Sequence, residues 1–498
     1  MTHGTLFKSA MLLLAGSLIL PSMASAETII RRASDLSGGG SESLDPITPT
    51  PFYYMNEFIY DTLVQPELGN PEPVPALAVS WSSNDAATEW TFKLREGVTF
   101  HDGSTLDAQD VVYSLDRIKD PALESPVTSM LEYIESVTAV DPMTVKIKLS
   151  AANADFLTVL QDDRISIIGE GSGDTIATTG IGTGPFKITT YDPEGTTVLA
   201  AFEEHWDGRP KVDGVTFVAI PDTSARVQAL QAGQIDMESV AIEHAGLFAD
   251  KSKFQILPYN DGGWNGIIFR TDTPPFDDAR VRKALRIAVD REEMIKLIAG
   301  PDGGQVACDN PVWQGDPYHA EIDCRQDIEG AKKLLAEAGY PDGIDIEVFT
   351  SDLEPAMVRY AEVYQQQVAA AGIRVTIRIT PGDGYWNDVW MVEPVTVTSW
   401  SGRPADIILN EAYRSTSSWN ETYYKSEELD ALLDAARAER DFEKRKEIFG
   451  KAQRLLFEEG GSLIAFYTNV LNVVSTRIKG IPEANSPFIR WHHVEIVE

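Results

Sequence analysis

The chain has 498 residues, of which 43% are hydrophobic and 24% are charged. This composition is typical of a globular protein and excludes a disordered chain, and the length can bury two or three hydrophobic cores. Because 76 Asp and Glu residues stand against 42 Lys and Arg residues, the formal net charge is -34. A charge of this sign repels phosphate backbones and anionic lipids, so we expect no nucleic acid and no membrane surface as a partner.

Residues 1–26 read as a secretory signal peptide. A cationic start with Lys8 precedes the apolar stretch 10–20, and the small residues 24–26 form a cleavage site. The apolar stretch has only about half the length that a membrane-spanning helix needs, so we expect no membrane insertion. We therefore expect cleavage after Ala26 and a soluble mature chain in the periplasm.

The chain contains two cysteines, Cys308 and Cys324. Both lie in the exported part, where thiols oxidise, so we predict a disulfide between them. Closing a loop of this size stabilises the folded chain by about 3 kcal/mol in the chain-entropy model. The alternative is a pair of buried thiols that stay unpaired.

Two segments near the start of the mature chain alternate apolar and polar residues. Residues 90–95 and 145–149 therefore predict strands with one buried face, in antiparallel sheet. Later segments carry apolar residues at helical spacing. They predict a helix over 278–289, a second helix that Asp290 caps, and a third helix that starts at Asp327.

The C-terminal part contains a βαβ pattern. A strand at 344–348, a helix over about 355–371 and a strand at 374–379 predict two parallel strands that a helix connects. A pair of helices follows at 427–437 and 442–459. Together these elements predict the α/β class with antiparallel additions.

The sequence carries none of the common catalytic motifs: no Gly-x-Ser-x-Gly elbow, no phosphate-binding loop and no His-Glu-x-x-His helix. Segment 180–185 is rich in glycine, but Pro185 lacks the N–H that a phosphate cradle uses, so we interpret it as a turn or hinge. His101 and Asp102 are similar to a catalytic pair, although a turn is the commoner role for an Asp that precedes Gly. A glycosidase with two carboxylates stays open, because one sequence does not fix their separation.

His492 and His493 are adjacent, and with Glu495 they can be drawn as a metal site. Adjacent side chains on a strand point to opposite faces, so we expect no metal at this position. We also expect no cofactor.

Several short motifs follow one another in a familiar order. They are Ser43 to Pro46, Ile59 to Leu63, Trp90 to Ser114, Gly182 to Lys187, Gly233 to Asp236 and Pro275 to Arg282. In this order they resemble family 5 of the extracellular solute-binding proteins of ABC importers, which includes dipeptide-, oligopeptide-, glutathione-, nickel- and opine-binding proteins. The resemblance spans nearly the whole mature chain.

The resemblance implies a two-lobed periplasmic-binding-protein fold of type II, in its large form with three subdomains, whose hinge strands let the lobes close over a ligand. Lobe one is expected at 27–262 plus 475–498, with the extra subdomain near 71–182, and lobe two at 263–474. The implied partners are a small-molecule ligand and the membrane permease of the importer. We expect a monomer.

Aromatic residues outside core spacing are the best ligand-binding candidates, since rigid rings offer large contact areas at low entropic cost. Trp264 follows two glycines at the predicted crossing between the lobes, and Trp400 opens a second loop. In similar dipeptide and oligopeptide binders, an Asp three residues after the Trp holds the ammonium group of the ligand. Here that position is Arg403, whose planar fork matches a carboxylate or phosphate.

We therefore hypothesise a ligand with an acidic group directed at Arg403, such as an opine, a sugar-amino-acid conjugate, a sugar acid or an unusually oriented peptide. The alternative is that Arg403 pairs with Asp406 or another acid and never meets the ligand.

Four further residues are candidates for contact with the ligand. Tyr53, Tyr54 and Met55 follow a segment that approaches the cleft in the family, although a core role is equally supported. Asn265 can bind the ligand or satisfy a turn.

The predicted mechanism is capture by closure, in which contacts made only in the closed form shift the population towards it. No covalent step is needed, so we do not expect an enzyme. The alternative function is a secreted α/β hydrolase that acts on peptides or glycosides.

Overall fold

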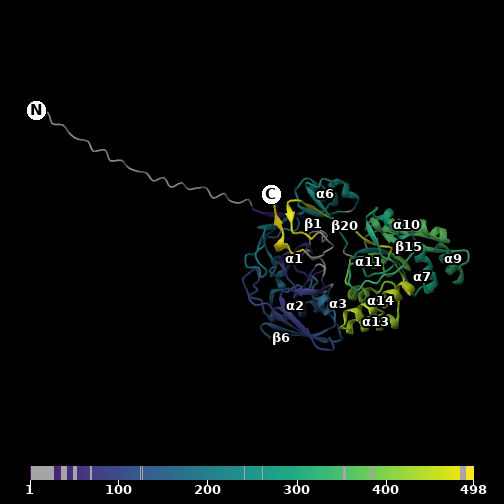
Figure 1. Ribbon diagram of the computed structural model, residues 1–498, viewed down its shortest axis with the longest axis horizontal. Helices are drawn as coiled ribbons and strands as arrows, with labels where there is room; N and C mark the ends of the chain where they lie inside the picture. The colour runs from purple at the N-terminus through teal and green to yellow at the C-terminus, as the bar shows by residue number, and fades with distance from the viewer. Residues whose placement is uncertain are drawn as a thin grey trace.

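The computed structural model describes residue 1 and residues 27–34, 42–48, 53–67, 70–123, 125, 127–240, 242–260, 262–351, 355–381, 385–482 and 489–497. In Figure 1 the purple-to-teal segments and the yellow C-terminal end lie in one body, and the green segments lie in the other. We call these bodies lobe one (residues 27–260 and 470–497) and lobe two (residues 262–469). Apart from residue 1, the predicted signal peptide lies outside the described residues, and its cleavage stays a prediction.

Lobe one is built on a four-stranded sheet of order β1-β10-β9-β8, in which β1 runs parallel to β10 and the other neighbours are antiparallel. The strands are β1 (Ile29–Ser34), β8 (Phe186–Thr190), β9 (Thr196–Ala201) and β10 (Gly214–Ala219). Helix α1 (Tyr53–Ile59) packs on this sheet through Phe58, whose ring contacts the rings of Phe186 and Phe217. The C-terminal Trp491 stacks on the same ring at 4.4 Å, so both ends of the chain share one core.

A second sheet of lobe one has the order β11-β20-β12 and is antiparallel. Its elements are β11 (Met237–Val240), β12 (Phe254–Tyr259) and β20 (Val470–Ser475), and α6 (Thr223–Gln231) contacts β11. Strand β20 falls almost wholly within the range 263–474 that the family resemblance implied for lobe two, yet both its partners precede residue 262. The exact domain boundaries stay a prediction.

The extra subdomain forms a separate antiparallel sheet of order β4-β5-β7-β6. Its elements are β4 (Ala78–Ser83), β5 (Glu89–Leu94), β6 (Ile134–Asp141), β7 (Thr144–Leu149) and the covering helix α2 (Ala108–Ile118). The strands predicted at 90–95 and 145–149 are confirmed as neighbours, and Trp90 lies opposite Ile147. Their inward residues form a hydrophobic core of their own with α2.

Lobe two is built on a five-stranded mixed sheet of order β16-β15-β17-β13-β18. Its strands are β13 (Trp264–Phe269), β15 (Ile344–Ser351), β16 (Ile373–Thr380), β17 (Val395–Trp400) and β18 (Ser462–Leu463). Strands β15 and β16 are parallel, and α10 (Pro355–Val368) connects them, which confirms the predicted βαβ unit.

The remaining helices of lobe two include the five predicted from helical spacing. They are α7 (Ala279–Ile287), α8 (Arg291–Ile298), α9 (Ile328–Glu337), α13 (Glu427–Ala438) and α14 (Phe442–Glu459). The predicted cap is also present: the side chain of Asp290 accepts a hydrogen bond from the N–H of Glu293 at 2.9 Å. Asp327, where the third helix was predicted to start, caps α9 by accepting one from the N–H of Gly330 at 2.7 Å. Local sequence signals therefore set these helix starts.

Short elements connect the sheets. They are β2 (Val64–Glu67), β3 (Asn70–Pro75), α3 (Thr128–Leu131), α4 (Phe156–Val159), α5 (Ile176–Thr179), β14 (Gly304–Val306), α11 (Tyr385–Asp388), α12 (Ala405–Tyr413), β19 (Phe466–Thr468), β21 (Ile478–Lys479) and β22 (Glu495–Ile496), with 3-10 turns η1 (Pro121–Leu123), η2 (Ser172–Asp174), η3 (Ile242–Phe248), η4 (Ala369–Ala371) and η5 (Trp491–His493).

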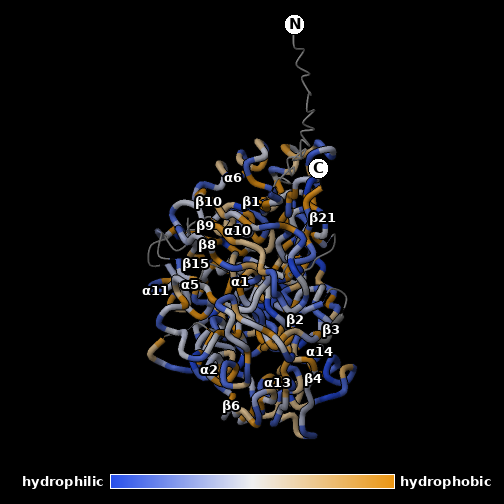
Figure 2. The backbone as a smooth tube through the Cα atoms, turned by 90° about the vertical axis from the view of Figure 1, so that its left-hand side faces the viewer, coloured by the Kyte–Doolittle hydropathy of each residue, from blue (hydrophilic) through white to orange (hydrophobic). Residues whose placement is uncertain are grey.

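Figure 2 shows hydrophobic and hydrophilic stretches alternating along the backbone of both lobes. Within the described residues, no helix combines the length and apolarity needed to cross a bilayer.

Two turns have the roles expected from the sequence. The pairing of Cys308 with Cys324 is present and closes a loop with a sequence separation of 16 residues. The segment 180–185 is a turn packed against the end of α1, where a Cβ on Gly182 would lie 1.9 Å from the carbonyl oxygen of Ile59. His101 supports this turn, because its Nε2 lies 2.9 Å from the carbonyl oxygen of Gly184.

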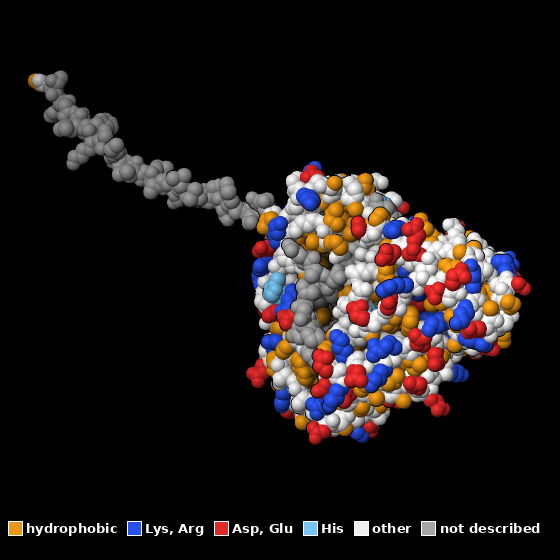
Figure 3. All heavy atoms as spheres, turned by 45° about the vertical axis from the view of Figure 1, so that its right-hand side comes forward, with side chains coloured by type: hydrophobic (Ala, Val, Ile, Leu, Met, Phe, Trp, Pro, Cys, Tyr) orange, Lys and Arg blue, Asp and Glu red, His pale blue; other side chains and the backbone are white. Residues whose placement is uncertain are grey.

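The charge on the surface is mixed rather than segregated. Figure 3 shows acidic side chains interspersed with basic ones on the visible face. Exposed pairs such as Arg374 with Asp345 and Arg378 with Glu347 contribute to this pattern. Such exposed pairs contribute little to stability, because water screens the two charges.

Candidate functional site

A cavity of about 630 Å³ is lined by residues of both lobes. Lobe one contributes the end of α1 and the segments 155–166 and 489–492, and lobe two contributes the loops 313–318 and 402–407. A volume of this size is typical of sites for small molecules. The cavity is therefore the candidate ligand site.

Charged side chains line much of the cavity wall. Its carboxyl groups belong to Glu57, Asp61, Asp155, Asp162, Asp163, Asp316 and Asp406, its guanidinium groups to Arg32, Arg403 and Arg490, and its imidazoles to His205 and His492. Some of these groups are held in close pairs. Asp162 lies 2.6 Å from Arg164, and Asp406 lies 2.8 Å from Arg437.

Three carboxyl groups of the wall have raised pKa values. Burial raises the pKa of Glu57 to about 7, and Arg32 at 3.9 Å opposes this only in part. Burial, together with the neighbouring Asp162, raises the pKa of Asp163 to about 6. Burial also raises the pKa of Asp316 to about 6 although its carboxylate accepts two backbone hydrogen bonds. Near neutral pH these groups can offer a hydrogen-bond donor or a charge to a ligand.

A buried ion pair joins the lobes beside the cavity. Oδ1 of Asp155, on the subdomain side, lies 3.0 Å from Nη2 of Arg445 on α14. The hydroxyl of Tyr318 donates to the same oxygen at 3.0 Å and accepts from Nε of Arg445 at 2.7 Å. The N–H of Ala154 also donates to the carbonyl oxygen of Arg437 at 2.7 Å. These contacts hold the two lobes together on one side of the site.

Arg403 lies on the cavity wall, but it is also paired. Its Nε donates to Oε2 of Glu411 at 2.6 Å, its Nη1 donates to Oγ of Ser401 at 2.8 Å, and its guanidinium lies 5.3 Å from the ring of Trp400. The alternative drawn from the sequence, an ion pair with an acid, is therefore present. The partner is Glu411, because Asp406 is bound to Arg437.

The other candidates of lobe two lie behind the cavity wall. Trp264 and Trp400 are opposite each other on β13 and β17, their ring centroids are 6.3 Å apart, and both are buried in a hydrophobic core. Neither lines the cavity, and neither does Asn265, whose buried Nδ2 has no hydrogen-bond partner among the described residues. Their role as ligand contacts stays a prediction.

The candidates of lobe one belong to α1. Met55 is fully buried in the core of the lobe. The side chains of Tyr53 and Tyr54 lie outside the described part of the structure, so the predicted contacts of these two residues are untested. Instead, Asn56 and Glu57 of the same helix line the cavity.

Trp390 and Trp400 share a buried carboxyl partner. The indole nitrogens of Trp390 and Trp400 donate to Glu421 at 2.5 Å and 2.8 Å. Burial raises the pKa of Glu421 to about 7, and these two hydrogen bonds oppose the shift only in part. The folded chain therefore retains a proton that the unfolded chain releases near pH 4.5.

The raised pKa of Glu421 predicts that the stability of the folded chain depends on pH. Because the pKa is higher in the folded chain, the contribution of Glu421 to the free energy of unfolding falls by about 3 kcal/mol as the pH rises from about 4.5 to about 7. We expect Glu421→Gln to remove most of that fall, which urea unfolding at pH 5 and pH 8 measures. Glu347→Gln, at an exposed pair, is the control, and an unchanged difference between the two pH values in Glu421→Gln contradicts the prediction.

The sequence alone did not identify several polar residues of the cavity wall, because they come together only in the folded chain. Asp155, Asp163 and Asp316 follow no motif, and their partners lie far away in the sequence or on the backbone. The signal that existed was an Asx pattern: the carboxylate of Asp316 accepts from the N–H of Tyr318, two residues on. That pattern predicts a turn but not a cavity.

The comparison with known families decides the class of the protein. The sequence model of the bacterial extracellular solute-binding proteins, family 5 (middle region), matches residues 72–438. The chain belongs to this family. The predicted two-lobed α/β fold is thereby confirmed, and this solute-binding protein is the substrate-binding component of an ABC import system.

Individual relatives cover nearly the whole solute-binding protein. It is 29% identical over 490 residues to heme-binding protein A of Haemophilus influenzae, covering 89% of this chain and 87% of the relative. It is 28% identical over 527 residues to the dipeptide-binding protein of Escherichia coli K12, covering 96% of each. The ABC transporter substrate-binding protein CtaP of Listeria monocytogenes has the same fold, with a TM-score of 0.82 at 24% identity, covering 95% of this chain and 99% of that one. These proteins are named for binding, so the secreted hydrolase is not favoured.

Proposed function

We propose that the protein captures, in the periplasm, a small solute that bears an acidic group, and delivers it to a membrane permease. In this proposal the signal peptide is cleaved after Ala26 and the mature chain acts as a monomer. The observation that carries the proposal is the position of Arg403. It lies on the cavity wall, and its Nη2 has no hydrogen-bond partner within the described part of the chain.

The pairing of Arg403 with Glu411 supports this role. A guanidinium group has five N–H donors in a fixed plane, and Glu411 and Ser401 take one donor each. These two contacts and the ring of Trp400 fix the plane of the guanidinium. The remaining donors are thus held in place for a carboxylate or a phosphate before the ligand arrives, which lowers the entropic cost of binding.

The wall contributed by lobe one favours a ligand with a second polar end. Glu57 and Asp163 line the cavity there, and Nδ2 of Asn56 donates to Asp163 at 3.4 Å. Carboxyl groups of this kind accept hydrogen bonds from ammonium or hydroxyl groups. An acidic group at Arg403 and amine or hydroxyl donors at the other end describe an opine, a sugar-amino-acid conjugate, a sugar acid or a peptide. The dipeptide-binding relative supports the peptide class.

Closure explains how such a ligand is captured. Loops 313–318 and 402–407 belong to lobe two, whereas Glu57 and Asp163 belong to lobe one. A ligand that touches both walls gains contacts only when the lobes are together. It therefore shifts the population towards the closed form, which a permease can distinguish from the open one.

Two variants with opposite expected effects on the affinity for the ligand test the role of Arg403. Native mass spectrometry of protein purified from a rich extract identifies the bound solute, and calorimetry with a panel of peptides, opines and sugar acids ranks affinities. For the tightest acidic member of the panel we expect Arg403→Ala to weaken binding at least tenfold. We expect Glu411→Gln to strengthen it, because the amide oxygen of Gln can still accept the hydrogen bond that orients the guanidinium, whereas the competing negative charge is removed.

A matched control separates this effect from a change in net charge. Arg378→Ala removes an exposed guanidinium that pairs with Glu347 outside the cavity, and it should leave the affinity unchanged. If Arg403→Ala binds the same solute as tightly as the unmodified protein does, Arg403 does not bind the acidic group of the solute.

A further inference from the structure

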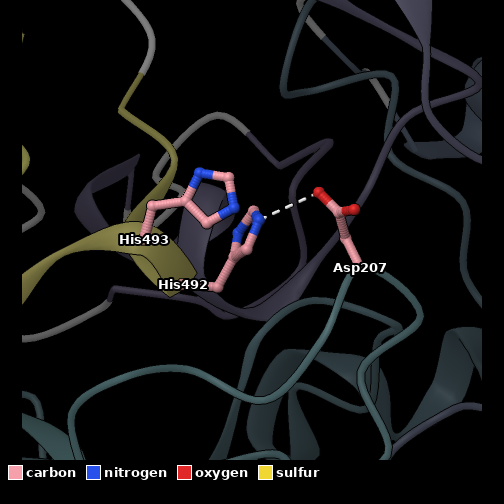
Figure 4. A group of neighbouring side chains, drawn as sticks. All are labelled: Asp207, His492 and His493. Carbon is pink, nitrogen blue, oxygen red and sulfur yellow. Dashed lines mark hydrogen bonds and ion pairs between the residues drawn. The ribbon is translucent and has the colours of Figure 1, made fainter.

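We propose that Asp207, His492 and His493 form a site for one divalent transition-metal ion of the zinc type. One ligand atom from each of the three side chains lies within 4.8 Å of the other two. Figure 4 shows the two imidazoles side by side on one short segment, with the carboxylate of Asp207 opposite them on another. Nε2 of His492 lies 2.9 Å from Oδ2 of Asp207.

The local backbone explains why the two histidines meet. The sequence argument against a metal assumed a strand, in which adjacent side chains diverge. That assumption was wrong, because Trp491–His493 is a 3-10 turn. The ring centroids of His492 and His493 are only 4.1 Å apart. The third member of the cluster is Asp207 rather than Glu495, whose carboxylate lies 3.4 Å from Nζ of Lys211.

The two segments are held together before any ion binds. The backbone N–H of Lys211 donates to the carbonyl oxygen of His492 at 3.2 Å. Asp207 and His493 are exposed whereas His492 is buried, so two of the three groups can adjust around a fixed one. Ligand atoms of a tetrahedral zinc ion, with bonds of about 2.0–2.2 Å, lie about 3.3–3.6 Å apart, and small rotations of the exposed side chains reach this spacing.

A third imidazole, that of His205, lies next to the cluster. The ring centroid of His205 is 5.1 Å from that of His492. Its Nε2 is buried and has no hydrogen-bond partner among the residues that the structure describes. His205 and His492 line the cavity between the lobes, whereas Asp207 and His493 are not among its lining residues, so the ion would lie behind this part of the wall of lobe one.

The donor set selects the class of ion. Imidazole nitrogens favour zinc, copper and nickel, whereas magnesium and calcium prefer sites made of oxygen atoms. Two imidazoles and one carboxylate would occupy three of the four coordination positions of a tetrahedral ion and leave the fourth open to water or to a solute.

Zinc titration of the full mature protein, produced without a polyhistidine tag and treated with a chelator beforehand, tests the site. We expect calorimetry to show one zinc ion per chain and no binding of magnesium. Asp207→Asn and His493→Ala each remove one exposed ligand, and each should weaken zinc binding at least tenfold. Glu495→Gln, next to the site but outside the cluster, should bind zinc like the unmodified protein.

The same experiment can overturn the proposal. Zinc that does not bind at micromolar concentration, or that binds Asp207→Asn or His493→Ala as tightly as the unmodified protein, excludes this cluster as the site. Circular dichroism of each variant shows whether it is folded. Because Arg403 and the acidic solute take no part in the assay, its result is independent of the function proposed above.

Discussion

Asp309→Asn is expected to lower the free energy of unfolding by about 3–5 kcal/mol, because it removes the carboxylate that pairs directly with two buried arginines. Oδ2 of Asp309 lies 2.7 Å from Nη2 of Arg291 and 3.2 Å from Nη1 of Arg286. All three side chains are at most 3% exposed. The other oxygen of Asp309 accepts the N–H of Ile464 at 3.1 Å, so this residue also ties α7 and α8 to the segment after β18.

Asp309→Asn removes the negative charge of the side chain and keeps its shape. Asp309 has a φ of 57°, and Asn is among the few residues that adopt this conformation readily. The backbone is therefore not disturbed. Urea unfolding at neutral pH measures the effect.

A surface pair is the control for this prediction. Asp345→Asn removes the same charge at the solvent-exposed contact with Arg374 and should change the free energy of unfolding far less, because water screens this pair. A loss for Asp309→Asn that is no larger than the loss for Asp345→Asn would show that the buried arginines are solvated in some other way.

The fold could be predicted wherever local patterns determine structure. The parallel strands β15 and β16 follow from alternating residues on either side of a helical segment, and the caps at Asp290 and Asp327 follow from one side chain and one nearby N–H. In each case the interacting atoms are close in the sequence. No knowledge of the tertiary structure is needed to find them.

The site could be predicted only in part, because its geometry depends on distant segments. Arg403 was found through the family resemblance, and it does line the cavity. The sequence could not show whether Glu411 or Asp406 pairs with Arg403, because both acids lie on α12. The choice depends on Arg437 of α13, which forms an ion pair with Asp406. Trp264 and Trp400 are paired across neighbouring strands, buried and absent from the cavity lining, and their predicted contact with a ligand stays untested.

The inter-lobe ion pair of Asp155 and Arg445 gives the second large expected effect. Asp155→Asn should shift the protein from the closed to the open arrangement. When the lobes separate, water replaces the lost contacts, so the cost of removing the charge falls on the closed form alone. At about 3 kcal/mol, the lower end for a buried pair, the ratio of closed to open molecules falls by about 150-fold.

Small-angle X-ray scattering measures this shift as an increase in the radius of gyration. Asp85→Asn is the matched control, because Asp85 and Arg440 join the same two bodies through an exposed contact at 3.5 Å, and its profile should be unchanged. Scattering profiles of Asp155→Asn and unmodified protein that superimpose contradict the prediction.

A double-mutant cycle identifies the cause of the shift. If the ion pair itself closes the lobes, Arg445→Met combined with Asp155→Asn should have no larger effect than either change alone, since the second substitution removes the charge that the first has left unpaired. Additive effects would instead place the energy of closure in other contacts, such as the hydrogen bond from Ala154 to Arg437. Because Asp155 and Tyr318 also line the cavity, a ligand bound there as proposed would contact the same residues that hold the lobes together, and capture would then be coupled to closure.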